Sequence, residues 1–287
     1  MRPCIALGVI IVSLALWFAE GLSAQGVVLP FIYSNEGNNE HWLNAEDKTS
    51  IAAAIKVKLA ELWQEEGVLE VCVEGDENAL LTYMEQNPKG IVVMNSFEAP
   101  STIFGKDDDS FVEKWLENGG IMIWESYYPF RMRGHARVPK ESFGNVFDVD
   151  IDFQKILAPK LETKPTDSGK RFMPSLKSYE TYIPVDIAIL DQLGFKYEVY
   201  GAVGENDEYA DPIMFRSPGM KGWFMYHHMN LYTDFVDWTK SVMKEGMAEQ
   251  IGTVIAEFIV NRFLFFAVDP VGKLATTWGM AKCHQGR

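Results

Sequence analysis

Asp109-Ser-Phe-Val-Glu-Lys-Trp-Leu-Glu-Asn-Gly-Gly-Ile-Met-Ile-Trp-Glu-Ser126 is the stretch that decides the fold of this chain. Ser110 and Glu113 have the spacing of a capping box, and the apolar residues around them recur at helical spacing. The glycine pair at 119 and 120 predicts the end of that helix, because glycine readily adopts the left-handed conformation that closes one. Ile121–Trp124 is then an apolar run too short for a second helix. The stretch therefore predicts a helix, a glycine stop and a buried strand.

The residues before this stretch continue the alternation of strand and helix. Three more apolar runs predict strands, and the segments between them have helical spacing. An uninterrupted alternation of this kind is typical of a parallel sheet with helices on both faces. The expected strands are 27–33, 69–73, 90–94 and 121–124, and the expected helices are 51–63, 77–87 and 110–117.

The chain beyond Ser126 is less regular. Residues 127–180 carry five prolines and mixed charges, which predicts an irregular insertion within a single α/β domain spanning residues 25–287. Pro212–Phe215 and Gly222–His227 predict a hairpin or two further strands. Gln250–Phe266 has apolar residues at helical spacing around two charged residues, which favours a helix packed on the core over a membrane span.

The N-terminus has the layout of a secretory signal peptide. Arg2 precedes an apolar run from Cys4 to Phe18, and small residues lead to a cleavage site near Ala24. Residues 1–24 are therefore expected to be a signal peptide, and the mature protein to be secreted or periplasmic, without stable membrane insertion. A membrane anchor is the alternative, but the apolar run is shorter than the roughly 20 residues that span a bilayer.

The formal net charge of −14 restricts the class of partner. Nucleic acids and anionic membrane surfaces bind basic patches, so neither is expected here. Cleavage would leave Cys72 and Cys283, which are too few for a disulfide framework, and whether they pair stays open. No motif indicates a cofactor, and the sequence leaves the oligomeric state open.

Two segments carry a family resemblance: Phe111-Val-Glu-Lys-Trp-Leu-Glu-Asn-Gly-Gly-Ile-Met-Ile-Trp124 and Gly222-Trp-Phe-Met-Tyr-His-His228. With the alternation before them, they resemble the class I glutamine amidotransferase-like superfamily, and within it an exported branch that lacks the catalytic cysteine. The resemblance implies a flavodoxin-like, doubly wound, mainly parallel sheet with helices on both faces. It also implies a nucleophile just after the strand that ends near Trp124, and a histidine after a late strand.

The sequence departs from that family where its chemistry would lie. The family's nucleophile elbow reads Gly-x-Cys-x-Gly, whereas this chain has Trp124-Glu-Ser-Tyr-Tyr128. An elbow needs small neighbours because its backbone is strained and closely packed. The family's His-x-Glu is replaced by His227-His-Met-Asn230, which keeps a histidine but not the carboxylate. Glutaminase activity is therefore not expected.

Polar residues follow several of the expected strands. In a doubly wound sheet, ligands bind beyond the carboxyl ends of the strands. These residues therefore form a candidate ligand-binding cleft, or else they simply cap strand ends, and the sequence leaves both readings open. The ligand-binding candidates are Asn35, Glu36, Asn95, Ser96, Glu125, Tyr127, Arg131 and His228.

Arg131 belongs to a local cluster of arginines. Arg131, Arg133 and Arg137 alternate and would share one face of an extended segment. They would then contact an anion or acidic glycan at the rim of the cleft, or pair with carboxylates of the same chain. The second reading is favoured in so acidic a protein.

The sequence is consistent with two functions. The leading hypothesis is an exported, non-catalytic ligand-binding or accessory module for an unknown small molecule or glycan. The alternative is a serine-type hydrolase in which Ser126 is the nucleophile, His227 or His228 its base, and Glu98 or Glu125 orients that base. No metal site is expected, because adjacent residues of a strand point to opposite faces and only one histidine would enter a given site.

Overall fold

The structure is a computed structural model of the chain. It describes residues 29–34, 45–62, 72–96, 99–104, 109–125, 129–130, 132–133, 136–137, 144–149, 154–157, 159–229 and 245–264.

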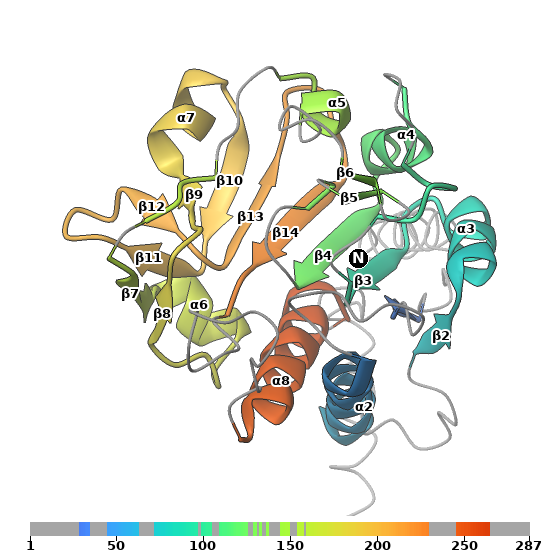
Figure 1. Cartoon of the computed structure of the whole chain (residues 1–287), viewed down its shortest axis with the longest axis horizontal. Helices are drawn as coiled ribbons and strands as arrows, with labels where there is room; N and C mark the ends of the chain where they lie inside the picture. The colour runs from blue at the N-terminus through green and yellow to red at the C-terminus, as the bar shows by residue number, and fades with distance from the viewer. Residues whose placement is uncertain are drawn as a thin grey trace, which may run out of the picture.

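A seven-stranded mixed sheet forms the centre of the molecule (Figure 1). Its strand order is β10-β13-β14-β4-β3-β1-β2. The five strands from β14 to β2 run parallel to one another, and β13 and β10 are antiparallel to their neighbours at one edge. The strands are β1 (Phe31–Tyr33), β2 (Val73–Gly75), β3 (Ile91–Met94), β4 (Ile121–Glu125), β10 (Lys196–Val199), β13 (Ile213–Arg216) and β14 (Trp223–His227).

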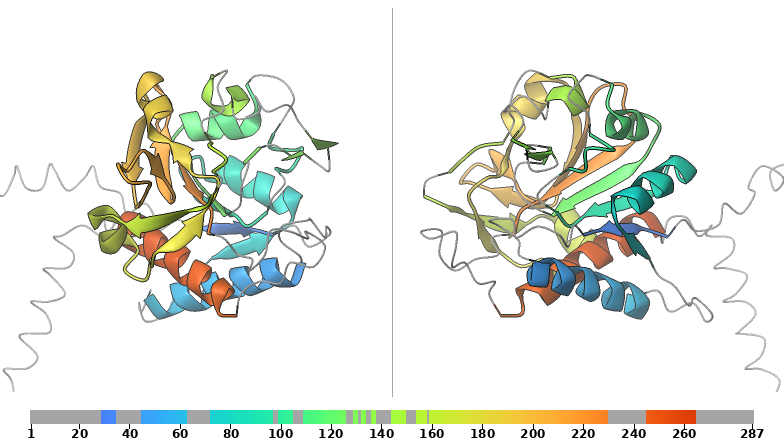
Figure 2. Two further views of the ribbon diagram at one scale, coloured as in Figure 1. Left: turned by 60° about the vertical axis from the view of Figure 1, so that its left-hand side comes forward. Right: turned by 45° about the vertical axis from the view of Figure 1, so that its right-hand side comes forward.

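Helices cover both faces of this sheet. The helices α2 and α8 lie side by side on one face, and both views of Figure 2 place α3 and α4 on the other. The sheet residues alternate accordingly, so that Val93 and Ile123 pack with α2 and α8 while Met94 and Trp124 pack with α3 and α4. The helices are α2 (Ala45–Leu62), α3 (Glu77–Gln86), α4 (Phe111–Glu117), α5 (Gly144–Phe147), α6 (Asp167–Phe172), α7 (Ile187–Gln192), α8 (Met247–Ile259) and the π-helical turn η2 (Val260–Leu264).

A second sheet lies beside the first and is wholly antiparallel. Its order is β8-β7-β11-β12-β9, and a separate antiparallel pair is formed by β5 and β6. These strands are β5 (Met132–Arg133), β6 (Ala136–Arg137), β7 (Leu161–Pro165), β8 (Tyr179–Thr181), β9 (Val185–Asp186), β11 (Gly201–Val203) and β12 (Tyr209–Ala210).

The predicted fold class was therefore wrong. A flavodoxin-like, doubly wound, mainly parallel sheet does not have two antiparallel edge strands and a second antiparallel sheet. The physical reason lies in the connections. A short turn joins β13 to β14 and can only join antiparallel neighbours, whereas parallel strands need a longer crossover.

The segment from Asp109 to Glu125 folds as a helix, a glycine stop and a strand, as predicted. The Ser110 amide donates to Glu113 Oε2 at 3.1 Å, and the Glu113 amide donates to Ser110 Oγ at 3.4 Å, which completes the capping box. Gly119 closes the helix with a φ of 115°, a conformation that favours glycine. At Gly120 a Cβ would lie 2.3 Å from the Trp115 ring, so the strand enters the sheet directly against α4.

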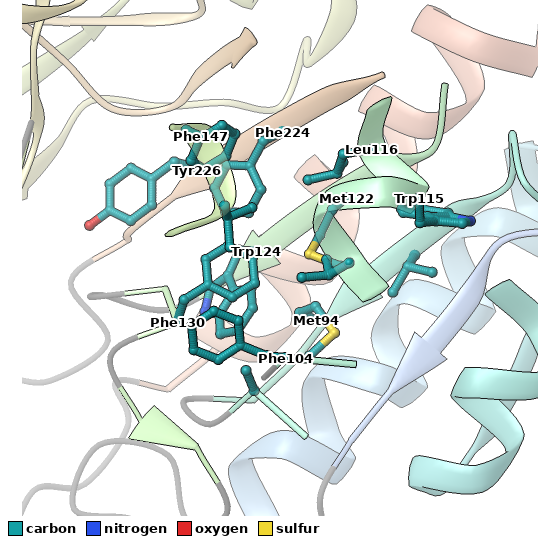
Figure 3. Packing of buried hydrophobic residues seen from close by; sticks show 14 of the residues in the cluster. Met94, Phe104, Trp115, Leu116, Met122, Trp124, Phe130, Phe147, Phe224 and Tyr226 are labelled. Atoms are coloured by element: carbon teal, nitrogen blue, oxygen red, sulfur yellow. The ribbon is translucent and has the colours of Figure 1, made fainter. Parts of the chain in front are cut away.

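An aromatic cluster fills the α3 and α4 face of the sheet (Figure 3). Trp124 is fully buried, and its ring centroid lies 4.9 Å from that of Phe130 and 6.4 Å from that of Phe224. Phe147 meets Phe224 edge-on at 5.5 Å.

Within the described ranges, no helix is long and apolar enough to cross a membrane.

Candidate functional site

A row of buried polar residues crosses four adjacent strands at their carboxyl ends. Met94 pairs with Trp124 on β4 and with Tyr33 on β1. The residues that follow them, Asn95 and Ser34, therefore lie level with Glu125. His227 pairs directly with Glu125. By strand alternation, Ser34, Asn95, Glu125 and His227 all belong to the face that α2 and α8 cover. We refer to these four residues as the polar row.

The centre of the row is a carboxylate–imidazole pair. His227 Nδ1 contacts Glu125 Oε2 within hydrogen-bonding distance, and the side chains are 0% and 1% exposed. The other ring nitrogen of His227, Nε2, is buried and has no hydrogen-bond partner in the described part of the chain. A bond at Nδ1 fixes the orientation of the ring and leaves Nε2 as the atom for a further interaction.

Asp211 is a second buried carboxylate beside this pair. It lies between β12 and β13 and is fully buried. Its Oδ2 accepts a hydrogen bond from Thr181 Oγ1 at 2.7 Å, and its Oδ1 accepts one from the His228 amide at 2.8 Å. Its backbone carbonyl accepts from Thr163 Oγ1 at 2.7 Å. Asp211 thus joins the antiparallel sheet to the end of β14.

The three ionisable groups shift one another's protonation. Burial raises the pKa of Glu125, against the opposing charge and hydrogen bond of His227. Burial likewise raises the pKa of Asp211, partly offset by the charge of His227 and by the hydrogen bond from Thr181. Burial acts to lower the pKa of His227, but the charge of Glu125, the hydrogen bond to it and the charge of Asp211 raise that pKa above its ordinary value. Because the pKa values of Glu125, Asp211 and His227 are all raised, the three groups together tend to bind a proton.

Tyr179 encloses the pair from the antiparallel sheet. Its ring meets the His227 ring edge-on, with centroids 6.2 Å apart and planes at 89°. Burial raises the pKa of Tyr179 well above its ordinary value, and the charge of Asp211 adds to the rise. Tyr179 therefore stays a neutral phenol.

The other end of the row is held by helix α2. Asn95 Nδ2 donates to the Lys48 carbonyl at 2.7 Å and to Ser34 Oγ at 3.2 Å. These bonds fix the amide so that Oδ1 is the free acceptor, and Asn95 Oδ1 is buried without a hydrogen-bond partner among the described residues. The Lys48 side chain is only 1% exposed.

His228 lies in a different environment from its neighbour. Its ring stacks on Tyr226 at 6.4 Å and meets Tyr182 edge-on at 5.0 Å. Burial lowers the pKa of His228 to about 3, and the charges of His227 and Lys160 act in the same direction. His228 is therefore neutral at ordinary pH, and its role as a ligand contact stays a prediction.

The structure describes five of the predicted site residues. Asn95, Glu125 and His227 lie together in the polar row, as the rule for strand ends predicted, and Ser96 is buried next to Asn95. The remaining candidates lie outside the described residues, and these are Asn35, Glu36, Glu98, Ser126, Tyr127 and Arg131.

One predicted pattern, the arginine cluster, has a different local structure. Arg133 pairs with Ala136 and Met132 with Arg137, so this segment folds back as a hairpin and is not a single extended run. Among the described residues, no group of three or more His, Cys, Asp or Glu side chains is arranged to hold a metal ion.

Sequence reasoning missed Asp211, Thr181 and Tyr179. The sequence did carry a signal for Asp211, which lies in the apolar segment Tyr209-Ala-Asp-Pro-Ile-Met-Phe215. Burying a carboxylate without hydrogen-bond partners costs free energy, so its presence there predicts partners. Thr181 and Tyr179 come from β8, about 30 residues away, and only the pairing of the second sheet brings them to Asp211.

Comparisons with known proteins do not assign a family. No protein-family model matches the chain, and no curated protein matches it. Among solved structures, it is similar to the exo-beta-1,4-mannosidase Op5Man5 from Opitutaceae bacterium strain TAV5, with a TM-score of 0.35 and 13% identity. The match covers 76% of this chain and 34% of that chain, so this chain spans about a third of the mannosidase's length. A likeness this distant assigns neither fold nor activity, and the amidotransferase-like relationship stays a prediction.

Proposed function

We propose that this protein is a non-catalytic ligand-binding or accessory module, and that the polar row binds a small neutral molecule rich in hydroxyl groups, such as a glycan. Export of the protein remains part of this proposal. The observation that carries it is the pair of buried, unpartnered polar atoms in the described row, Asn95 Oδ1 and His227 Nε2.

The unpartnered atoms flank a single strand. Asn95 follows β3 and His227 ends β14, and these are the two neighbours of β4. Buried polar atoms normally have a hydrogen-bond partner, so two on the same row favour a ligand that supplies both bonds. Two strand spacings amount to about 9.6 Å. Two hydrogen bonds of about 2.8 Å would account for roughly 5.6 Å of that backbone spacing, and a pair of neighbouring hydroxyls would bridge the remainder.

The chemistry of the row favours a hydroxyl over other groups. A hydroxyl donates one hydrogen bond and accepts others, so one of two neighbouring hydroxyls can donate to Asn95 Oδ1. The other can donate to Nε2 of a neutral His227 ring or accept from Nε2–H of the imidazolium. Glu125 within the row and Asp211 beside it disfavour an anionic ligand, as does the formal charge of −14.

The experiment is a glycan and metabolite binding screen on the purified protein, followed by calorimetry with the strongest ligand. Asn95→Ala should weaken binding by at least tenfold. The matched control is Asn118→Ala, since the Asn118 amide also donates to a backbone carbonyl, Lys114 O at 2.9 Å, but at the exposed end of α4. Equal affinities for both variants would contradict the proposal.

One observation favours a second candidate, a serine-type hydrolase. An oriented imidazole with a free Nε2 is the base half of a nucleophile–base–acid arrangement, and Glu125 would be the orienting carboxylate. Ser126, the residue after Glu125, would be the nucleophile. Against this candidate, His227 is fully buried, and the bulky Trp124 stands two residues before Ser126 in a motif where an elbow needs small residues. Fluorophosphonate labelling that is lost in Ser126→Ala would establish it.

A further inference from the structure

We propose that Glu125, His227 and Asp211 form one proton-binding site that keeps His227 as an imidazolium, so that ligand binding at the polar row is coupled to a single proton. This inference rests on the proposed function for its ligand, and it adds regulation of the same site.

The groups that face His227 come from four segments. Glu125 on β4 bonds Nδ1, Asp211 lies in the β12–β13 connection, and Tyr179 on β8 meets the ring edge-on. His228, next in the chain, is neutral because burial lowers its pKa to about 3. Tyr226 on the same strand donates its hydroxyl to the Ile183 carbonyl at 2.8 Å. Two carboxylates therefore act on one imidazole.

Within the described ranges, the hydrogen bonds to the Asp211 carboxylate come from uncharged groups. The Thr181 hydroxyl and the His228 amide that it accepts from are neutral donors. Among the described residues, the ion pair at this cluster is Glu125 with His227. Buried carboxylates are stable only when they are paired or protonated, so one proton on His227 serves both Glu125 and Asp211.

The proton decides what His227 offers a ligand. When the imidazole is neutral, Nδ1–H donates to Glu125 and Nε2 is an acceptor. When a proton is added at Nε2, that atom becomes a charged donor, and charge-assisted hydrogen bonds are about twice as strong as neutral ones. Because Nε2–H is buried without a partner in the described part of the chain, a ligand oxygen placed there satisfies it. Binding should therefore weaken when the pH rises far enough to remove the proton.

The test is nuclear magnetic resonance of the purified protein with ¹⁵N-labelled histidine. Of the five histidines, His227 should keep both ring nitrogens protonated above pH 7, and His228 should stay neutral down to acidic pH. Asp211→Asn should lower the titration midpoint of His227 by about one pH unit or more, because it removes a nearby negative charge. Thr181→Val, which removes a hydrogen bond to Asp211 but no charge, is the matched control and should lower it far less.

A His227 ring that is neutral at pH 7 in the wild-type protein would overturn the inference, even if every variant fails to fold.

Glycerol, the smallest probe with neighbouring hydroxyls, then tests the coupling. It should shift the His227 Nε2 resonance below the titration midpoint and much less above it. An equal shift at both pH values would overturn the coupling while leaving ligand binding intact. No shift at any pH, with the titration as expected, would instead count against the proposed hydroxyl ligand.

Discussion

His227 and Glu125 sit opposite each other on the parallel strands β14 and β4, with Nδ1 of the imidazole bonded to Oε2 of the carboxylate and neither side chain exposed by more than 1%. A buried ion pair need not stabilise a fold, because the free energy of desolvating two charges can exceed the energy of their attraction. The pair lies at the carboxyl ends of the strands, between Asn95 and Asp211, where doubly wound sheets bind ligands, and the proposed binding role rests on this position.

Glu125→Gln tests how much the fold depends on this pair. The variant keeps the shape of the side chain but removes its charge, and it should lower the free energy of unfolding by about 3 kcal/mol, as expected when one partner of a buried pair is lost. Urea denaturation measures the change. Glu117→Gln, at the exposed end of α4, is the control and should change stability by less than about 0.5 kcal/mol. Equal losses of unfolding free energy in Glu125→Gln and Glu117→Gln would mean that the buried pair does not stabilise the fold.

His228→Gln should change how stability depends on pH. The folded protein holds the pKa of His228 near 3, whereas the unfolded chain takes up a proton below about 6.5. A lowered histidine pKa stabilises the fold above the unfolded value, and that contribution is lost as the pH falls from about 6.5 toward 3. Between pH 7 and pH 5, the stability of the wild type relative to His228→Gln should fall by about 2 kcal/mol. A constant difference between the two proteins would show that His228 titrates normally.

His227 should have the opposite dependence. Its pKa is raised, so its stabilising contribution is fully present below about 6.5 and is lost as the pH rises through the folded value. His227→Gln should therefore cost more stability at pH 6 than at pH 9. Chemical denaturation of both proteins at the two pH values measures this. A larger loss of stability in His227→Gln at pH 9 than at pH 6 would contradict a raised pKa of His227.

Asp211 and Thr181 should be energetically coupled. The hydrogen bond of 2.7 Å between them joins the antiparallel sheet to the end of β14 through a charged acceptor. A double-mutant cycle of Asp211→Asn and Thr181→Val should give a coupling energy of about 1.5 kcal/mol or more, typical of hydrogen bonds to charged groups. Additive effects would show that the two side chains act independently.

Ser110→Ala tests the element on which the fold prediction rested. Loss of the Ser110 hydroxyl removes half of the capping box of α4 and should cost about 1 kcal/mol of stability. Ser101→Ala is the control, because the exposed Ser101 hydroxyl makes only a weak contact with Glu77 at 3.4 Å. A cost no larger than that of the control would mean that the cap does not stabilise α4.

The sequence predicted the parts of this molecule that depend on neighbouring residues. The capping box at Ser110, the glycine stop at Gly119 and the strand from Ile121 follow from local chemistry. Asn95, Glu125 and His227 were found because polar residues directly follow or end apolar strands, and parallel strands bring those ends to one edge.

Distant contacts were not predictable in the same way. The antiparallel sheet depends on pairings such as Gly201 with Pro165, which no local pattern specifies. The fold class was wrong for that reason, and Asp211 was missed because its partners Thr163 and Thr181 belong to that sheet. Burial of Lys48 beside Asn95 likewise depends on how α2 packs on the row.

The most direct test of the central claim is a crystal structure of the protein with the strongest ligand from the binding screen. The predicted result is a ligand with one oxygen within hydrogen-bonding distance of Asn95 Oδ1 and a neighbouring oxygen within hydrogen-bonding distance of His227 Nε2. A ligand bound elsewhere, with both atoms satisfied by the protein's own side chains, would contradict the claim that the polar row is the binding site.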